Sequence, residues 1–119
     1  MNDDQAGDVR PQPTAARPTR FTRTDRDGER TLTIVGEIDI ATKTELELEL
    51  ADLLAEAHSP ACVDLGGVSF MDSTAINALL LARRAGVENG TPLVVTAASV
   101  PARRVLEICG VWELLQRSV

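Results

Sequence analysis

The chain has 119 residues and a mass of 12.8 kDa, which suffices for one domain of ordinary size but not for two. Acidic residues outnumber basic ones by 18 to 12, and the resulting net charge of -6 argues against nucleic acid as a direct partner. An aromatic fraction of 3% leaves no stacking platform for single-stranded nucleic acid. We therefore expect a single domain with an aliphatic core.

The sequence also bears on location and redox chemistry. It shows no basic-then-apolar leader and no apolar run long enough to span a membrane, so we expect a cytoplasmic protein. The two cysteines, Cys62 and Cys109, lie far apart within apolar stretches and have no metal-ligand spacing. We expect both to be buried free thiols.

The first 19 residues differ in composition from the rest. They contain Pro11, Pro13 and Pro18 and almost no large apolar side chain. Such a segment buries too little surface to offset its ordering entropy. We expect a disordered tail over 1–19 and a folded domain over 20–119.

The first part of that domain reads as a hairpin followed by a helix. We expect strands at 21–24 and 31–38, joined by a turn at 25–28 in which Asp27-Gly28 is the hairpin signal. Thr42 and Glu45 have capping-box spacing, which predicts a helix from Thr42 to about residue 57. The helix repeat buries one stripe of leucines and leaves Leu48 partly exposed.

The second part alternates strands and helices, and Leu106 and Ile108 are the expected core contacts of its last helix. This order, β-β-α-β-α-β-α-(β), predicts an α/β fold with a mostly parallel sheet of four to five strands and helices packed on it. The expected elements are a strand at 61–65, a loop at 66–72, a helix at 73–89 ended by Gly90, a strand at 93–97, a helix opened by Ser99 or Val100, and a short strand at 114–117.

Catalytic patterns are absent from the sequence. There is no phosphate-binding glycine loop and no dinucleotide fingerprint, and the single histidine, His58, reads as a surface residue. We therefore predict no catalytic residue, no cofactor and no metal. One enzymatic alternative stays open, a bound metal held by Asp64 or Asp72, and it needs Asp39, Asp64 and Asp72 to converge.

The most informative segment is Val68-Ser69-Phe70-Met71-Asp72-Ser73-Thr74-Ala75-Ile76. It places a hydroxyl, that of Ser73, in the first turn of a helix that follows a buried strand. In open α/β sheets, functional sites form in the loops that leave the carboxyl ends of the strands. The free N–H groups of a helix start would stabilise a phosphate on Ser73. On the residues alone, the same pattern is what a plain helix N-cap looks like.

These residues carry a resemblance. With Gly36-Glu37-Ile38-Asp39 and Val63-Asp64-Leu65, the segment around Ser73 resembles the STAS-domain anti-sigma factor antagonists, over about residues 21 to 118. The resemblance implies a protein that binds an anti-sigma factor with serine kinase activity and thereby releases a sigma factor. It implies that phosphorylation of Ser73 ends this binding, and that Asp39, Asp72, Thr74 and Asn77 face the partner.

The resemblance leaves two points open. The family often has glycine two residues after the phosphorylated serine, where this chain has Ala75, so docking could differ. STAS domains also serve as accessory subunits of lipid-transport ATPases or as interaction modules that do not cycle, and this is the alternative function. The sequence predicts no oligomeric state.

Overall fold

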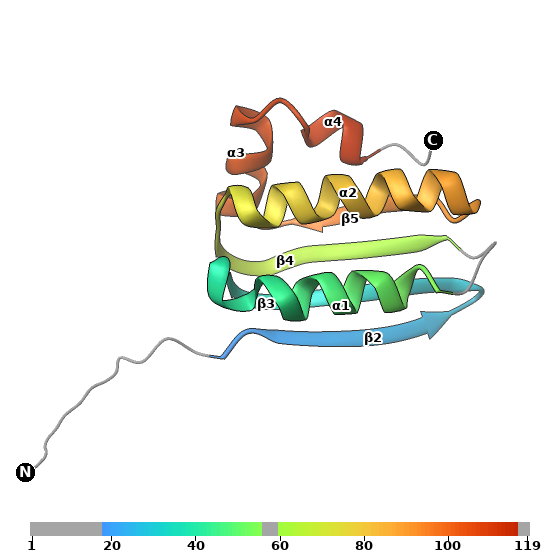
Figure 1. The fold of residues 1–119 in the computed structure, drawn as a ribbon. Coiled ribbons are helices and arrows are strands. Elements are labelled where there is room, and N and C mark those ends of the chain that lie inside the picture. Colours follow the sequence, from blue (N-terminus) through green and yellow to red (C-terminus); the bar gives the residue numbers. More distant parts are fainter. Residues whose placement is uncertain (1–17, 56–59, 117–119) are drawn as a thin grey trace, which may run out of the picture.

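The computed structural model describes residues 18–55 and 60–116, which form one α/β domain (Figure 1). In this part of the chain the sheet has four strands, in the order β2-β3-β4-β5. The elements are β2 (Arg20–Arg26), β3 (Glu29–Ile38), the 3-10 helix η1 (Ile40–Thr42), α1 (Lys43–Leu53), β4 (Ala61–Met71), α2 (Ser73–Asn89), β5 (Leu93–Ala98), α3 (Val100–Ile108) and α4 (Trp112–Leu115).

The sheet is mostly parallel, as predicted. β2 pairs antiparallel with β3, whereas β3, β4 and β5 run parallel to one another. Along β3, Leu32 and Ile34 are fully buried while Thr31 and Thr33 are half-exposed, so one face of the sheet carries the core. Figure 1 shows α1 and α2 side by side on that face, with α1 against β3 and α2 against β5.

The first hairpin is tighter than the sequence suggested. Arg26 pairs with Glu29, so only Asp27 and Gly28 form the loop, with φ of 54° and 81°. Two central residues with positive φ match the twist of the flanking strands, which favours a two-residue turn. β2 therefore extends to Arg26, and the predicted turn at 25–28 was too wide.

β4 corrects the predicted loop at 66–72. The strand continues from Ala61 to Met71, because the long β3 offers it partners as far as Ile38, which pairs with Met71. The pairing of β3 with β4 has two register irregularities, one between Thr33 and Val35 and one between Gly36 and Glu37. A Cβ at Gly67 would come within 2.9 Å of the Val35 side chain. Only Asp72 separates β4 from α2.

The start of α1 also differs from the prediction. The capping box is formed by Asp39 and Thr42 around η1, and Thr42 makes no side-chain cap to α1. The helix ends at Leu53 instead of near residue 57, which lies outside the described residues. Leu48 is 66% exposed, so that prediction is confirmed.

The C-terminal part contains two further corrections. Leu106 is fully buried as predicted, but Ile108 is 78% exposed. Ala102 and Leu106 face the core four residues apart, and a residue two positions later points to the opposite side of a helix. The segment expected as a strand at 114–117 begins within helix α4, so it adds no strand to the sheet.

The two cysteines differ in their surroundings. Both are free, but Cys62 is buried in β4 whereas Cys109, the C-cap of α3, is exposed, contrary to prediction. Burial foremost, and the nearby Glu29 carboxylate next, raise the pKa of the Cys62 thiol, while a hydrogen bond with Thr31 acts in the other direction. Cys62 therefore stays protonated and unreactive at neutral pH.

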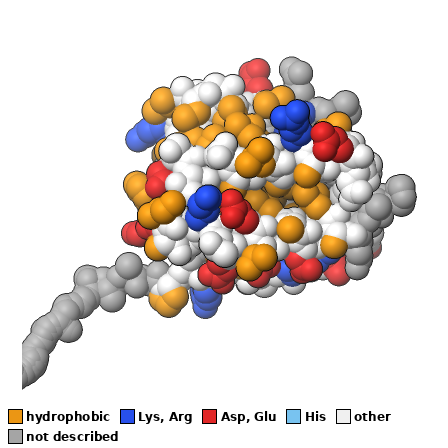
Figure 2. All heavy atoms as spheres, in the orientation of Figure 1, with side chains coloured by type: hydrophobic (Ala, Val, Ile, Leu, Met, Phe, Trp, Pro, Cys, Tyr) orange, Lys and Arg blue, Asp and Glu red, His pale blue; other side chains and the backbone are white. Residues whose placement is uncertain are grey.

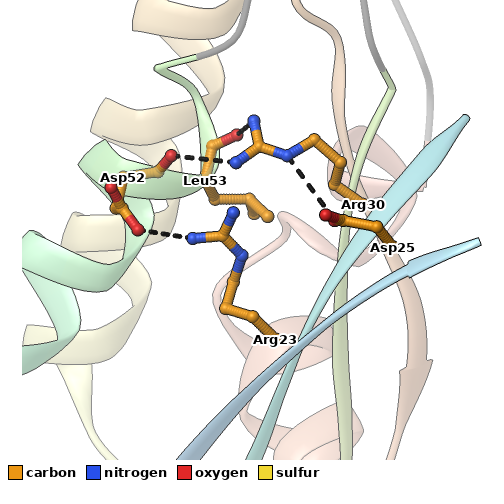
Figure 3. A network of polar contacts seen from close by, with 5 residues as sticks. All are labelled: Arg23, Asp25, Arg30, Asp52 and Leu53. Carbon is orange, nitrogen blue, oxygen red and sulfur yellow. Dashed lines mark hydrogen bonds and ion pairs between the residues drawn. The ribbon is translucent and has the colours of Figure 1, made fainter.

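A buried arginine ties the hairpin to the end of α1 (Figure 3). Arg30 is 4% exposed, and its guanidinium donates to the carbonyl oxygens of Leu53 and Asp52, the latter at 3.2 Å. Its Nε lies 3.8 Å from Asp25 Oδ1, and Arg23 pairs with the Asp52 carboxylate at 2.6 Å. Arg30 thus supplies a donor to the Leu53 carbonyl and a second donor to the Asp52 carbonyl, which also accepts from the Ala55 N–H at 3.2 Å.

Some expectations concern residues outside the described part. Residues 1–17 of the predicted tail and His58 fall there. The last residue of the predicted tail, Thr19, is described, and its hydroxyl donates to the Glu37 carbonyl. Within the described ranges no helix is both long and apolar enough to cross a bilayer.

Candidate functional site

The carboxyl ends of the three parallel strands meet at one edge of the sheet. β3 ends at Ile38, β4 at Met71 and β5 at Ala98, and the next residue in each case is a helix N-cap: Asp39, Asp72 or Ser99. Figure 1 shows α1, α2 and α3 all starting at this edge. Sites in open α/β sheets form at such edges, and we call this the carboxyl edge.

The two predicted carboxylates at this edge act first as caps. Asp39 Oδ1 accepts a hydrogen bond from the Ala41 N–H at 3.0 Å, and Asp72 Oδ1 accepts one from the Thr74 N–H at 2.9 Å. Both residues are half-buried. Their carboxylates satisfy helix N–H groups, which is the usual task of aspartate at an N-cap.

Ser73 has a different position from these caps. It is the first residue of α2 and its side chain is exposed. Because Asp72 is the N-cap, the structure assigns the capping role to the residue before Ser73. Ser73 is therefore an exposed residue at a helix start, where an anion is stabilised.

A shallow groove of about 490 Å³ runs between the first turns of α1 and α2 and contains Ser73. Of the predicted site residues, the structure brings Ser73, Thr74 and Asn77 together in it, while Asp39 and Asp72 lie next to lining residues without lining it themselves. The lining residues are Ile40, Lys43, Glu47, Ser73, Thr74, Ile76, Asn77, Ala78 and Leu80.

Sequence reasoning missed the other wall of this groove. Ile40 is 72% exposed, and Lys43 and Glu47 form an ion pair at 3.9 Å. Their sequence signal was that of an ordinary charged helix surface. Only the packing of α1 against α2 places them beside Ser73.

Apolar side chains are exposed around the same edge. Besides Ile40, Phe70 is 48% exposed and Val100 is 70% exposed, and each lies within two residues of the end of a parallel strand. Figure 2 shows hydrophobic side chains interspersed with charged ones on this side of the molecule. Exposed apolar residues that gather in one region are typical of a protein-binding surface.

Ala75, which departs from the family's glycine, does not reach this surface. It is fully buried and belongs to the core. Its methyl group faces the interior, so it cannot contact a docked partner directly.

The metal-dependent alternative finds no site in residues 18–55 and 60–116. No three His, Cys, Asp or Glu side chains of these ranges are grouped to hold a metal ion. Asp64 accepts a hydrogen bond from the Gly66 N–H at 2.8 Å, and Asp39 and Asp72 cap separate helices. The three carboxylates do not converge.

The fold and the site together define a small α/β module with an exposed serine beside a helix start. A family model described as "Mlab, STAS domain" matches residues 22–116. The chain is 31% identical over 80 residues to the anti-sigma-B factor antagonist of Staphylococcus epidermidis. The matched stretch covers 67% of this chain and 74% of that relative. The chain therefore belongs to the STAS-domain family, as the motifs around Ser73 indicated.

Solved structures agree with this assignment. An anti-sigma factor antagonist from Mycobacterium paratuberculosis superposes with a TM-score of 0.71 at 25% identity, covering 82% of this chain and 83% of that one. The anti-sigma factor antagonist SpoIIAA in its unphosphorylated form superposes with a TM-score of 0.68 at 16% identity, covering 82% and 86%. The second comparison supports the fold alone.

Proposed function

We propose that this protein is a cytoplasmic anti-sigma factor antagonist whose binding is switched off by phosphorylation of Ser73. Its partner is an anti-sigma factor with serine kinase activity, and binding this partner releases a sigma factor. The observation that carries the proposal is the exposed Ser73 hydroxyl in the groove at the carboxyl edge. The names of the relatives in Staphylococcus epidermidis and Mycobacterium paratuberculosis support the same role.

The surroundings of Ser73 suit protein docking. Thr74 and Asn77 offer polar groups along the groove, and Ile40 offers an exposed apolar side chain on the facing wall. A standard protein interface buries roughly 1,600 Å² in total, enough to include this groove and the residues around Asp39 and Asp72.

The switch follows from electrostatics. The kinase would transfer the terminal phosphoryl group of ATP to the Ser73 oxygen, adding a charge of about -1.5 to -2 at neutral pH. Burying that charge in an interface where the docking protein offers no cation costs about 4 kcal/mol, or roughly a thousandfold in affinity. Since α2 tolerates an anion at its start, the fold itself need not change.

The test begins with the partner. The full chain, used as bait in extracts of its own host, should recover a GHKL-type kinase, and ATP should then add one phosphate at Ser73 by intact-mass and peptide analysis. Ser73→Ala should bind this kinase and remain unmodified, whereas Ser73→Asp should lose binding. Thr22→Asp is the matched control, because it adds the same charge on an exposed position of β2 and should bind normally.

Two results would contradict the proposal. Equal affinity of Ser73→Ala and Ser73→Asp for the recovered kinase would remove the switch. Recovery of a lipid-transport ATPase instead of a kinase would favour the accessory-subunit function.

A further inference from the structure

We propose that Lys43 is the internal counter-ion of a phosphate on Ser73. When Ser73 is phosphorylated, the Lys43 ammonium leaves Glu47 and pairs with the phosphate across the groove. This inference rests on the proposed phosphorylation and concerns the regulation of the same site.

The position of Lys43 is the first argument. Lys43 is the first residue of α1 and Ser73 the first residue of α2, and both line the same groove between two helices in contact. Among the lining residues Lys43 is the only base and Glu47 the only acid. A phosphate in this groove would therefore meet a single cation.

The second argument is that Lys43 is poorly placed for its own helix. The start of a helix carries partial positive charge, so a lysine in the first turn is unfavourable there. It is also the only lysine of the chain, against eleven arginines. A residue that breaks a local rule points to a role beyond the helix itself.

The existing partner of Lys43 holds it weakly. The Nζ to Glu47 Oε2 distance is 3.9 Å and both side chains are 46% exposed. A lysine four residues before a glutamate is also the less favourable order on a helix. Such exposed pairs contribute little to stability, so a phosphate dianion competes successfully for Lys43.

The exchange has a consequence for docking. In the unmodified groove the charges of Lys43 and Glu47 cancel. Lys43 stabilises the dianionic form of the phosphate, and Glu47 loses its ion-pair partner. The phosphate, Lys43 and Glu47 together then give the groove a net charge of about -2. A docking protein would then meet both the phosphate and a released carboxylate.

The experiment uses the full chain with phosphoserine inserted at position 73 during translation. The second pKa of the phosphate, ordinarily about 6, is measured by phosphorus NMR across that pH range. We expect the pKa to be about 0.5 lower with Lys43 than in Lys43→Gln, which is roughly a threefold difference in proton affinity. Lys43→Arg should retain the low value, because the cation is kept.

Arg84→Gln is the matched control. Arg84 and Glu88 form the same type of pair, four residues apart at 3.9 Å, but Arg84 does not line the groove. Its removal should leave the phosphate pKa unchanged. The same pKa in the wild-type chain and in Lys43→Gln would overturn the proposal.

The titration needs no partner protein, so its outcome is separate from that of the proposed function. A phosphoserine that leaves kinase affinity unchanged would contradict the function and leave the Lys43 pairing intact. A phosphoserine that abolishes affinity while Lys43→Gln has no effect on the pKa would retain the function and remove the pairing.

Discussion

The two ends of the parallel strands are built differently. At the carboxyl edge, short polar side chains cap the helices, and Ser73, Ile40 and Val100 are exposed. At the opposite end, Arg30 is buried against the last carbonyls of α1, and Gly86 packs closely on Thr91, which is fully buried. We call this second region the amino edge.

The difference indicates that the amino edge stabilises the fold while the carboxyl edge is available for binding. Buried polar groups and close backbone contacts make the amino edge sensitive to substitution, because any change leaves unpaired groups or forces atoms apart. The exposed groups of the carboxyl edge contribute little to stability and remain available for contact. Stability and recognition should therefore respond to different substitutions, which the following four experiments test.

Arg30→Met should have the largest effect, a loss of about 3 kcal/mol in the free energy of unfolding, because it removes the donor in the buried bond to the Leu53 carbonyl and one of the donors to the Asp52 carbonyl. Urea unfolding followed by circular dichroism measures this loss. Arg26→Met, on the exposed end of the same hairpin, should change stability by less than about 0.5 kcal/mol. Similar losses for both variants would mean that the buried contacts of Arg30 do not contribute more to the free energy of unfolding than an exposed arginine does.

Gly86→Ala should come next. A Cβ at this position would lie 2.3 Å from the Thr91 carbonyl oxygen, so the backbone after α2 must shift. Alanine gains about 1 kcal/mol in helix propensity, and we expect a net loss of about 2 kcal/mol. Val87→Ala, at the neighbouring exposed position, is the control in the same unfolding measurement. An unchanged or higher midpoint for Gly86→Ala would show that the contact relaxes without cost.

Ile40→Ser tests the recognition side. Ile40 is exposed on the wall facing Ser73, so its removal should leave stability within about 0.5 kcal/mol. Affinity for the recovered kinase should fall about tenfold, or about 1.4 kcal/mol, in a calorimetric titration. Ile108→Ser removes an equally exposed isoleucine at the far end of α3 and should bind normally. Equal losses for both would place the interface elsewhere.

Asp72→Ala should have the smallest effect, because it removes one N-cap. The Thr74 N–H loses its acceptor, and the cost should be about 1 kcal/mol in unfolding free energy. Asp72→Asn keeps the cap and removes the charge, so it should recover that stability. Affinity for the recovered kinase is measured for both variants. A loss of affinity in Asp72→Asn would mean that the carboxylate itself contacts the partner, whereas wild-type affinity in Asp72→Asn would limit Asp72 to capping.

Local signals in the sequence sufficed for much of the fold. The bounds of α2, its end at Gly90 and the start of α3 at Ser99 or Val100 were predicted from neighbouring residues alone. Capping and helix periodicity act within a few residues, so they can be read without the rest of the chain. The motif around Ser73 likewise indicated the STAS-domain family.

The tertiary structure decided what depends on distant residues. The length of β4 follows from its pairing with β3, and the exposure of Ile108 follows from which side of α3 meets the core. The groove is the clearest case, because Ser73, Thr74 and Asn77 come from α2 while Ile40 comes from η1 and Lys43 from α1. Sequence spacing fixes which residues share one helix, but only packing between α1 and α2 determines which side chains face each other.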